Sequence, residues 1–455
     1  MKLKTSKNAE INYLAKVIEI KEFTKHPNPK VERLKCCKVD GFNIITGIDS
    51  EPGLYIYFPV MSKINSQFLS YNNLFRHKEL NVNPDTNPGY FEDNGRVTII
   101  KLQGVVSEGF LINANALQNF IVDNFNLELK LEHGTEFDTI EHEGKEVKLV
   151  SKYKVQNAPG SQRTGYDKST HSAKKFNKII EGQFRFHYET TIIRKCPWVI
   201  TPEDIIHISE KVHGTSFISA NVLCKTELNW KQKIAKFLTH EEFKKYDNVY
   251  SSRKVIKNPT YNPEVNGGYY GCDVYGKANE IIAPKLDKGM TIYGEIVGFT
   301  PNGMYIQKNY DYGCVAPSDD SYVYDKNFKL KIYRITLTNV DGVVHEFSTQ
   351  EVRLWCSEHN LDPVMEYYYG KAGDLYPDLV KDDLWSEKFI ERLANDSDFN
   401  MELNSPTCYN KVPHEGIVIK VENMKSQAFK LKCFAFLNKE QKDLDKGIEN
   451  IEDNQ

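Results

Sequence analysis

Short runs of β-forming residues, separated by turn formers, recur along most of this sequence and constrain its fold more than any other feature. Between Ile11 and Leu111 they follow one another closely, as in AKVIEIKEF, LKCCKVD, FNIITGI and LYIYFPV. Spacing of this kind favours a small barrel. We therefore expect a β-barrel in the first part of the chain, with the polar segment 66–94 as a long loop or a short helical excursion.

The chain divides into parts. A length of 455 residues exceeds what one hydrophobic core usually supports. Residues 151–178 contain few apolar side chains and several turn formers, which is typical of a linker. Beyond them, runs such as TIYGEIVGF and HEGIVIKVE alternate with helical stretches, which predicts an α+β domain built on antiparallel sheets. We expect a barrel domain at 1–150, a basic linker at 151–195, a second domain at 196–438 and a frayed acidic tail at 439–455.

Three helices are expected in the second part. Residues 228–246 (LNWKQKIAKFLTHEEFKKY) carry apolar side chains at about helical spacing. Ser348 and Glu351 have the spacing of a capping box that opens the helix EVRLWCSEHN. The segment DDLWSEKFIERL starts with acids and then repeats apolar residues.

Charge and cysteine content narrow the class of protein. The formal net charge is -3, so any polyanion site must be local. Residues 151–180 provide a local basic surplus that includes Lys174 and Lys175, which is either a solvated loop or a binding patch. The nine cysteines form no C-x-x-C pair, and we find neither an apolar leader nor a stretch long enough to span a membrane. We expect a cytoplasmic, reducing location and no structural metal.

Four charged segments stand out in the second part: KVHG at Lys211, YGE at Glu295, EGIVIK at Glu415 and KLK at Lys430. In a strand of period two, Lys430 and Lys432 point to one face, where an acid or a phosphate would relieve their repulsion. Each segment alone is as consistent with an ordinary strand or turn residue as with a functional one. Together they predict a cleft for a triphosphate, with acids for a metal and ribose hydroxyls and lysines for phosphates.

In this order, the four segments resemble motifs I, III, IV and V of the covalent nucleotidyltransferase superfamily, which contains ATP-dependent DNA and RNA ligases and messenger-RNA capping enzymes. SSRK at 251–254 resembles motif Ia, and KIYRITLTN at 331–339 sits where the superfamily has an aromatic motif IIIa. EGQFRFHYET, EKVHGTS and YRITLTN look like the Deinococcus and Naegleria type of RNA ligase, and we interpret the histidine of EKVHGTS as a feature of that branch. The first 110 residues are similar to an OB module, so the resemblance spans most of the chain.

The resemblance implies an α+β fold, with an N-terminal OB-type β-barrel followed by an antiparallel-sheet adenylyltransferase domain of ATP-grasp-like ligase type. It implies an ATP-dependent RNA ligase that joins a 3′-OH RNA end to a 5′-phosphate end, at nicks, through a lysyl-AMP intermediate. The implied cofactors are ATP and Mg²⁺ or Mn²⁺. The implied partners are RNA or RNA-containing duplex ends, with the protein acting as a monomer away from membranes.

The resemblance also assigns roles to individual residues. Lys211 is the implied nucleophile and Glu415 the implied metal ligand. The residues implied for nucleotide binding are Glu210, His213, Gly214, Arg253, Glu295, Tyr333, Lys430 and Lys432, and those implied for nucleic acid are Arg185, His187, Lys174 and Lys175.

Three of these assignments are specific enough to check. Tyr333 would stack on adenine, although Ile332 or Arg334 could hold that place. His213 either takes the place of the usual aspartate near AMP and metal or packs under the loop as a spacer. Gly214 would let the backbone approach the nucleotide closely.

Two other classes of function stay open. A DNA ligase or a capping-type transferase uses the same lysine chemistry on another substrate. A catalytically inactive nucleic-acid-binding protein would use only the barrel and the linker, but it would not need the matched charged residues. No C-terminal OB domain with motif VI is recognisable after Lys432, which favours an RNA ligase.

Overall fold

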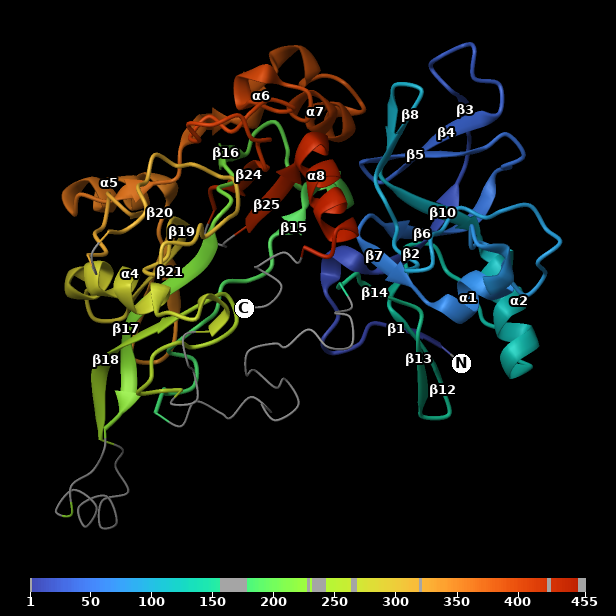
Figure 1. Cartoon of the computed structure of the whole chain (residues 1–455). Helices are drawn as coiled ribbons and strands as arrows, with labels where there is room; N and C mark the ends of the chain where they lie inside the picture. Colours follow the sequence, from blue (N-terminus) through green and yellow to red (C-terminus); the bar gives the residue numbers. More distant parts are fainter. Residues whose placement is uncertain are drawn as a thin grey trace.

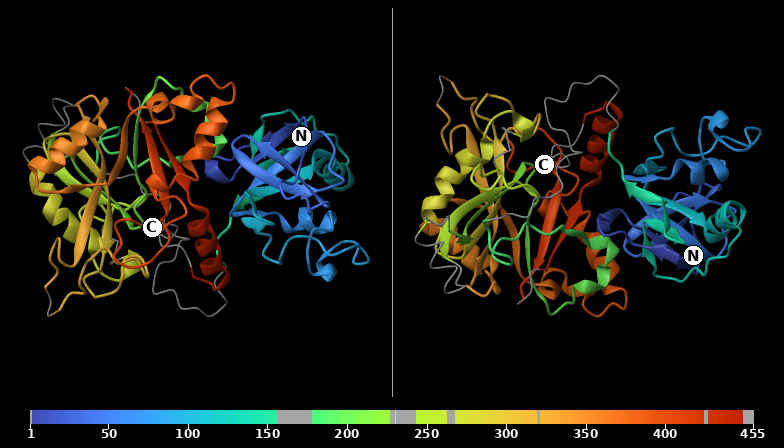
Figure 2. Two further views of the ribbon diagram at one scale, coloured as in Figure 1. Left: turned by 90° about the horizontal axis from the view of Figure 1, so that it is seen from above. Right: turned by 90° about the horizontal axis from the view of Figure 1, so that it is seen from below.

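Most strand pairs in the described part of the protein are antiparallel, and helices lie beside the sheets (Figure 1). The structure is a computed structural model that describes residues 2–155, 178–226, 230, 243–262, 268–318, 321–423 and 427–448. Two regions lie side by side: the N-terminal region, residues 2–155, and the C-terminal region, which begins at residue 178 (Figures 1 and 2). The expected mixed fold with mostly antiparallel sheets is confirmed. Lys174 and Lys175 lie outside the described residues.

The described strands of the N-terminal region lie in several small sheets. One has the order β10(Gly109–Asn113), β6(Gly53–Pro59), β2(Ala15–Ile20), β11(Glu136–Phe137), and a second the order β3(Thr24–Lys25), β4(Leu34–Val39), β5(Phe42–Gly47). The remaining sheets are β1(Lys2–Lys4), β12(Thr139–His142), β13(Lys145–Lys148); β14(Val150–Lys152) with β7(Ser62–Ile64); and β8(Ile100–Leu102) with β9(Val105–Ser107). Hydrogen bonds among these strands do not close a barrel, so the OB-type barrel stays a prediction.

Two helices close the core of the N-terminal region. Helix α1(Ser66–Tyr71) is the expected helical excursion, and α2(Ala114–Phe125) begins at Asn113, whose side chain accepts a hydrogen bond from a backbone N–H of the first turn. Phe58 of β6 packs with Phe68 of α1, which in turn contacts Phe120 of α2 edge to face. Burial of these rings holds the helices against the sheet.

Two larger sheets form the C-terminal region. One has the order β18(Lys244–Ser251), β17(Thr215–Lys225), β19(Met290–Gly298), β20(Phe328–Thr338), β21(Val344–Glu346), with β22(Asp362–Pro363) parallel to β20. The other has the order β15(Thr191–Ile192), β25(Gln427–Lys432), β24(Gly416–Val421), β16(Ile205–Glu210), β23(Glu366–Lys371). These are called the six-stranded and five-stranded sheets.

Helices bury the outer faces of both sheets. Helices α4(Val274–Ile282) and α5(Thr349–Glu358) share a core with the six-stranded sheet. Helices α6(Ala372–Leu375) and α7(Trp385–Leu393) share a second core with the five-stranded sheet. Helix α8(Phe434–Asp445) follows β25 directly and stands between the two regions in Figure 1.

Two of the three expected helices are confirmed. Helix α5 opens with the capping box of Ser348 and Glu351, and α7 falls within the segment DDLWSEKFIERL. Most of the helix expected at 228–246 lies outside the described residues, and its last residues 244–246 belong to strand β18 instead. The frayed tail expected from residue 439 is wrong for residues 439–445, which continue α8 because the helix buries Phe436 and Leu444.

Helix α8 connects the two regions. Asp445 at its end accepts a hydrogen bond from the buried Arg96 guanidinium at 2.5 Å, and the Gln441 side chain accepts one from the Ile99 N–H at 2.9 Å. At its start, the Phe436 ring lies 5.1 Å from the ring of His213. The helix therefore contacts the N-terminal region and the Lys211 loop at once.

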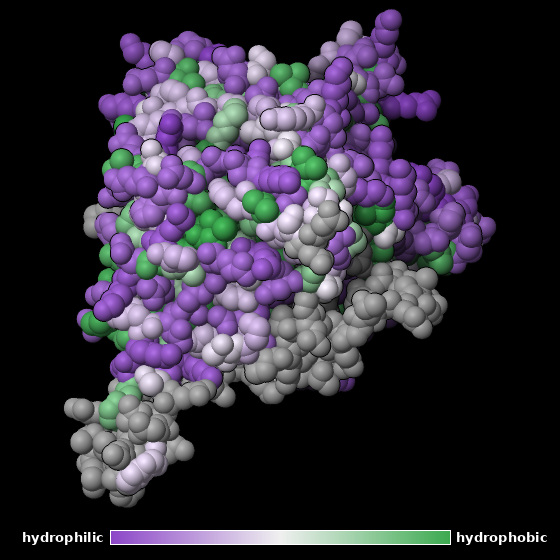
Figure 3. Space-filling view, turned by 60° about the vertical axis from the view of Figure 1, so that its left-hand side comes forward, coloured by the Kyte–Doolittle hydropathy of each residue, from purple (hydrophilic) through white to green (hydrophobic). Residues whose placement is uncertain are grey.

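The surface is predominantly polar. On the face shown in Figure 3, apolar residues form small groups among hydrophilic ones. No helix in the described part of the chain combines the length and the apolar character needed to cross a membrane. All nine cysteines are free thiols.

The capping box of α5 yields a stability prediction. Replacing Ser348 with Ala removes the acceptor for the Glu351 N–H, which typically costs about 1 kcal/mol. For a domain of this size we expect the thermal unfolding midpoint to fall by about 2–4 °C. Differential scanning calorimetry measures it. Ser357→Ala, in the exposed last turn of the same helix, is the control, and an equal fall in both variants would contradict the role of the cap.

Candidate active site

Lys211 lies where the chain leaves the five-stranded sheet and enters the six-stranded one. It directly follows β16, and β17 begins four residues later. Its backbone N–H donates to the carbonyl of Gly416 at 2.8 Å, which fixes the loop against the start of β24. The lysine side chain therefore reaches the space between the two sheets from a backbone held on both sides.

The carboxylate of Glu415 holds two lysines. Its Oε1 lies 2.8 Å from the Nζ of Lys211 and 3.4 Å from the Nζ of Lys432. The side chain of Glu415 is only 2% exposed. Burial alone would raise the pKa of Glu415, but the two ammonium groups and His213 outweigh it and keep that pKa well below its ordinary value.

A glycine next to Glu415 permits this arrangement. Gly416 has φ of 135°, and a Cβ there would lie 2.1 Å from the Leu431 carbonyl oxygen. Any other residue would push β24 away from β25, since the two strands pair from Gly416 to Lys432 onward. The glycine therefore sets the distance between Glu415 and Lys432.

Lys430 and Lys432 point to the same face of β25, as the sequence predicts. Both line the pocket that contains Lys211, whereas Leu431 between them is buried in the core. Burial lowers the pKa of Lys430 from 10.5 to about 7, and the neighbouring charges of Lys432, Lys211 and Arg253 add to that effect. The site therefore concentrates positive charge where an anion would relieve it.

These residues border one cavity between the two sheets, which we call the inter-sheet pocket. Its lining includes His187, His207, Ser209, Lys211, Ser216, Arg253, Glu295, Tyr333, Arg334, Glu346, Val418, Lys420, Lys430, Lys432 and Glu440. The sequence analysis assigned roles to seven of them, His187, Lys211, Arg253, Glu295, Tyr333, Lys430 and Lys432, and named Arg334 as an alternative to Tyr333. Glu210, which it also named, borders the pocket as well. Glu415 lies beneath the pocket and reaches it through its lysine partners.

Glu295 and Tyr333 enter the pocket from the six-stranded sheet. Glu295 is buried on β19, which pairs with both β17 and β20. The Tyr333 ring on β20 meets the ring of His187 edge to face at 5.2 Å. Of the three candidates for the aromatic position, Ile332 is buried in the core behind the sheet, and Arg334 is paired with Glu346.

His213 combines the two alternatives that the sequence left open. Its ring packs edge to face against Tyr310 and Phe436, with centroids 4.7 and 5.1 Å away. Its Nδ1 also lies 3.3 Å from Oε2 of Glu415. The histidine therefore packs under the loop and faces the carboxylate at the same time.

Gly214 is required for a different reason from the expected one. A Cβ at this position would lie 2.4 Å from the Ile296 carbonyl oxygen and 2.7 Å from Cγ of Glu295. The loop therefore packs directly on β19, and the missing side chain leaves room for that strand. Close approach of the Gly214 backbone to the nucleotide stays a prediction.

Glu210 differs from the expectation. The Glu210 Oε1 accepts hydrogen bonds from the hydroxyls of Ser405 and Thr407 at 3.0 and 2.9 Å. Along β16, Glu210 alternates with Ser209 and Lys211, so its carboxylate turns toward the loop of Ser405 although the residue borders the pocket. Because the hydroxyls of Ser405 and Thr407 hold its carboxylate, Glu210 forms part of the pocket wall.

Of the four residues expected to contact nucleic acid, Arg185 and His187 are described, and they lie in different places. His187 lines the inter-sheet pocket, and burial lowers its pKa well below the ordinary value, so the ring is neutral. Arg185 instead donates from Nη2 to the carbonyl of Gly342 at 2.9 Å, on the turn between β20 and β21. Only His187 is brought to the lysine cluster.

Comparison with known proteins identifies the family of this chain. The sequence model of the RNA ligase family matches residues 204–432, which is half of the chain and runs from the start of β16 to the end of β25. The chain belongs to the RNA ligase family. No curated protein matches this RNA ligase in sequence.

Solved structures of the Naegleria gruberi RNA ligase share the fold. A mutant with ATP and Mn and another with AMP and Mn each have 13% sequence identity and a TM-score of 0.54, covering 94% of this chain and 99% of theirs. The same enzyme with PPi has a TM-score of 0.52 at 13% identity, with the same coverage. The likeness in fold therefore includes the N-terminal region.

The Naegleria structures also bear on His213. They include mutants of a lysine and of an aspartate two positions after it. In this RNA ligase the residue two positions after Lys211 is His213. That spacing counts against our interpretation of the histidine as a feature shared with the Naegleria enzyme.

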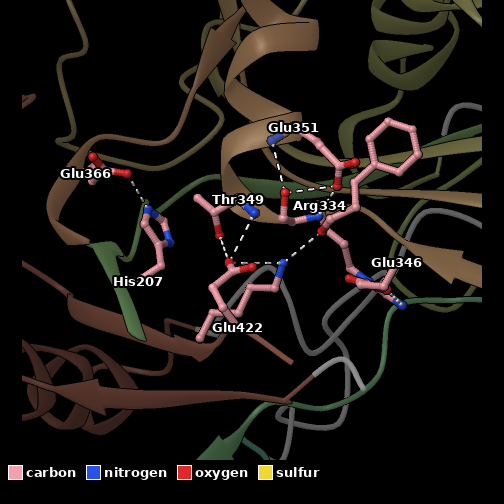
Figure 4. Close-up of polar contacts among 10 residues, drawn as sticks. His207, Arg334, Glu346, Thr349, Glu351, Glu366 and Glu422 are labelled. Atoms are coloured by element: carbon pink, nitrogen blue, oxygen red, sulfur yellow. Dashed lines mark hydrogen bonds and ion pairs between the residues drawn. The ribbon is translucent and has the colours of Figure 1, made fainter. Parts of the chain in front are cut away.

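Sequence reasoning missed a polar network at the end of the pocket (Figure 4). Glu422 accepts hydrogen bonds from the N–H and the hydroxyl of Thr349, and His207 lies 3.3 Å from Glu366. The Arg334 guanidinium donates to Glu346 from Nε at 2.8 and 3.1 Å and from Nη2 at 2.9 Å. The contacts of Glu422 join the start of α5 to the five-stranded sheet.

The sequence contained one signal for the position of His207. His207 and Ser209 lie two residues apart on β16, and Lys211 follows the strand at the same spacing, so period two places them on one side. Burial lowers the pKa of His207 to about 4 against the opposing effect of Glu366, so its ring is neutral near pH 7.

Lys430 gives this RNA ligase a pH-dependent stability. Its folded pKa of about 7 lies below its ordinary value of 10.5, so the folded state disfavours the charged lysine. The full cost is present below pH 7 and diminishes as the pH rises toward 10.5. Lys430→Met should therefore raise the thermal midpoint of the ligand-free protein more at about pH 6 than at about pH 9.

Thermal scans of the wild type and Lys430→Met at both pH values measure this difference. Lys381→Met, which changes an exposed lysine, should shift neither midpoint appreciably. An equal effect of Lys430→Met at the two pH values would contradict the lowered pKa.

Proposed function

We propose that this protein is an ATP-dependent RNA ligase that works through a lysyl-AMP intermediate. The single observation that carries the proposal is the group formed by Lys211, Glu415 and Lys432, with Lys430 on the same wall of the pocket. One amine is positioned among cations and a buried acid, which is an arrangement suited to attack on a phosphate. The RNA ligase family supplies the substrate class.

The chemistry runs in three displacements at phosphorus. Lys211 first loses a proton to water, and its neutral amine attacks the α-phosphorus of ATP. A P–N bond forms, the nitrogen releases a second proton to water, and the bond to pyrophosphate breaks. The 5′-phosphate of an RNA end then displaces the lysine and receives AMP. The adjacent 3′-OH finally attacks that phosphate, forms the phosphodiester and releases AMP. Positioning and charge neutralisation supply most of the catalysis in such steps.

The residues around the pocket take defined parts. Lys430 and Lys432 bind the α-phosphate, and Glu295 holds the ribose hydroxyls. The base lies between Tyr333 of β20 and Val418 of β24, which line the pocket from the two different sheets. Arg253 contacts a phosphate or the ribose. His187 stays neutral and packs beside Tyr333 rather than binding charge.

The carboxylate of Glu415 is suited to binding a divalent metal. No group of three or more His, Cys, Asp or Glu side chains within the described ranges could hold a metal by itself. Mg²⁺ typically uses one or two carboxylates and completes its shell with water and substrate phosphates, which suits the single buried Glu415. A bound Mg²⁺ or Mn²⁺ would neutralise phosphate charge. Sharing the charge of Glu415 would also weaken its hold on the proton of Lys211.

The finer assignments form part of the same proposal. The ends joined are a 3′-OH and a 5′-phosphate, presented at a nick. Residues 1–150 act as an OB-type module that grips RNA, ahead of the linker 151–195 and the adenylyltransferase domain 196–438. The ligase is of the Naegleria type, as the likeness in fold over 94% of the chain supports.

Retention of label from ATP tests the proposed function. Purified protein, first treated with pyrophosphate to remove any bound adenylate, is incubated with α-labelled ATP and Mg²⁺ and separated by denaturing electrophoresis. We expect acid-labile label on the wild type and none on Lys211→Ala. Glu415→Gln should reduce labelling at least tenfold, since one charge of the group is lost.

Controls separate this outcome from misfolding. Lys381→Ala, on the surface, should label like the wild type. Circular dichroism checks that Lys211→Ala keeps the fold. Absence of label on the folded wild type with both ATP and GTP would overturn the proposal.

A further inference from the structure

Three further features of the molecule could hold a ligand. The largest cavity, about 820 Å³, is a groove between the N-terminal region and helices α7 and α8. A smaller one beside His213 borders α8. A third, about 370 Å³, lies on the N-terminal region next to the inter-sheet pocket. The charges and neighbours of these cavities distinguish them.

The large groove is balanced in charge. Its lysines and its arginine are matched in number by glutamates, and some of these charges already pair, such as Lys38 with Glu391 at 3.1 Å and Arg194 with Glu108 at 3.3 Å. A balanced lining gives a polyanion little attraction. The cavity beside His213 contains Lys439, which pairs with Asp443 at 2.9 Å on the same helix.

The third cavity, which we call the lysine hollow, has an excess of positive charge. Lys63, Lys148, Lys152 and Lys154 line it, against the two acids Glu10 and Asp138. Asp138 is buried and accepts hydrogen bonds from the N–H and hydroxyl of Ser6. Glu10 lies 3.8 Å from both Lys152 and Lys154, which is a long separation for an ion pair.

Strand pairing brings these lysines together. Strand β14 pairs with β7, and Lys63 lies opposite Ser151. Neighbouring strands are about 4.8 Å apart, so Lys63 and Lys152 lie close along one ribbon, although period two turns their side chains to opposite faces. Both residues line the hollow. Lys154 continues the same edge with a side chain that is 61% exposed. Lysines distant in sequence thus line one hollow.

The lysine hollow joins the inter-sheet pocket. Tyr13 and Lys152 line both cavities, and the Nζ of Lys152 lies 5.3 Å from the centre of the Tyr13 ring. The preceding residue, Asn12, donates to Glu189 at 2.9 Å, and Glu189 also lines the pocket. A chain of phosphates lying in the hollow would therefore lead to the cluster around Lys211.

We propose that the lysine hollow binds the phosphates of the RNA strand whose 5′ end receives AMP. This inference rests on the proposed function, because the 5′-phosphate must reach Lys211. The lysines contact the backbone, and Tyr13 offers a ring for base stacking at the entrance, the combination that single-strand binding sites use. Lys152, at the boundary, contacts the end of the strand.

RNA binding by matched double variants tests the inference. Lys63→Gln/Lys154→Gln removes two cations of the hollow, and Lys148 is kept because it lies 3.5 Å from the buried Asp138. The control Lys21→Gln/Lys101→Gln removes two exposed cations that line the large groove of the same region. The probe is a short single-stranded RNA with a 5′-phosphate, followed by fluorescence anisotropy over a series of salt concentrations.

We expect the hollow variant to bind this RNA on the order of tenfold more weakly at about 0.1 M salt. The slope of log affinity against log salt should be smaller by about 1.4, which is 0.7 for each lost phosphate contact. The control should bind like the wild type. Equal binding by the hollow variant and the wild type would overturn the inference, and so would an equal or larger loss in the control, which would place RNA in the groove.

Formation of lysyl-AMP separates this inference from the proposed function. The hollow variant should label with α-labelled ATP like the wild type, since Lys63 and Lys154 do not line the inter-sheet pocket. Transfer of AMP to the 5′-phosphate of RNA should slow at low RNA concentration and recover at high concentration. Labelling that fails in the wild type refutes the proposed function, whereas wild-type labelling with unchanged RNA binding refutes only the hollow.

Discussion

The positions of Lys211 and Lys432 depend on one buried carboxylate, that of Glu415. Its Oε1 contacts the Nζ atoms of both lysines, one from a loop and the other from a strand. A buried charge without partners is expensive, and removing one partner from such a group typically costs about 3–5 kcal/mol. The fold therefore stabilises the lysines in place before any ligand arrives, and the site is preorganised for an anion.

The two large sheets explain how so many charges share a small space. Lys211 follows β16 of the five-stranded sheet, and Lys430 lies on β25 of the same sheet. Glu295 and Tyr333 project from the six-stranded sheet. The hydrogen bonds from Thr349 to Glu422 link helix α5, which packs on the six-stranded sheet, to the end of β24 in the five-stranded one. Sequence matching detects only this C-terminal part, residues 204–432, while the likeness to solved ligases covers nearly the whole chain. The N-terminal region lies outside the residues matched by the family's sequence model but is included in the likeness in fold.

Local patterns predicted much of this site. Alternation placed Lys430 and Lys432 on one face, and the capping box marked the start of α5. The reason for Gly214 could not be predicted, because it depends on the carbonyl of Ile296, more than eighty residues away in the chain. The direction of Glu210 depends likewise on hydroxyls of the loop at Ser405. Motif resemblance assigned both residues to the nucleotide, although packing explains them.

Helix α8 has a consequence for the design of fragments. Its last turn is held by Arg96 and its Gln441 by Ile99, while its first turn touches His213. An isolated C-terminal region would expose these contacts to water and free one end of the helix. The two regions therefore share contacts through α8, and a C-terminal fragment without residues 2–155 would lack those made by Arg96 and Ile99.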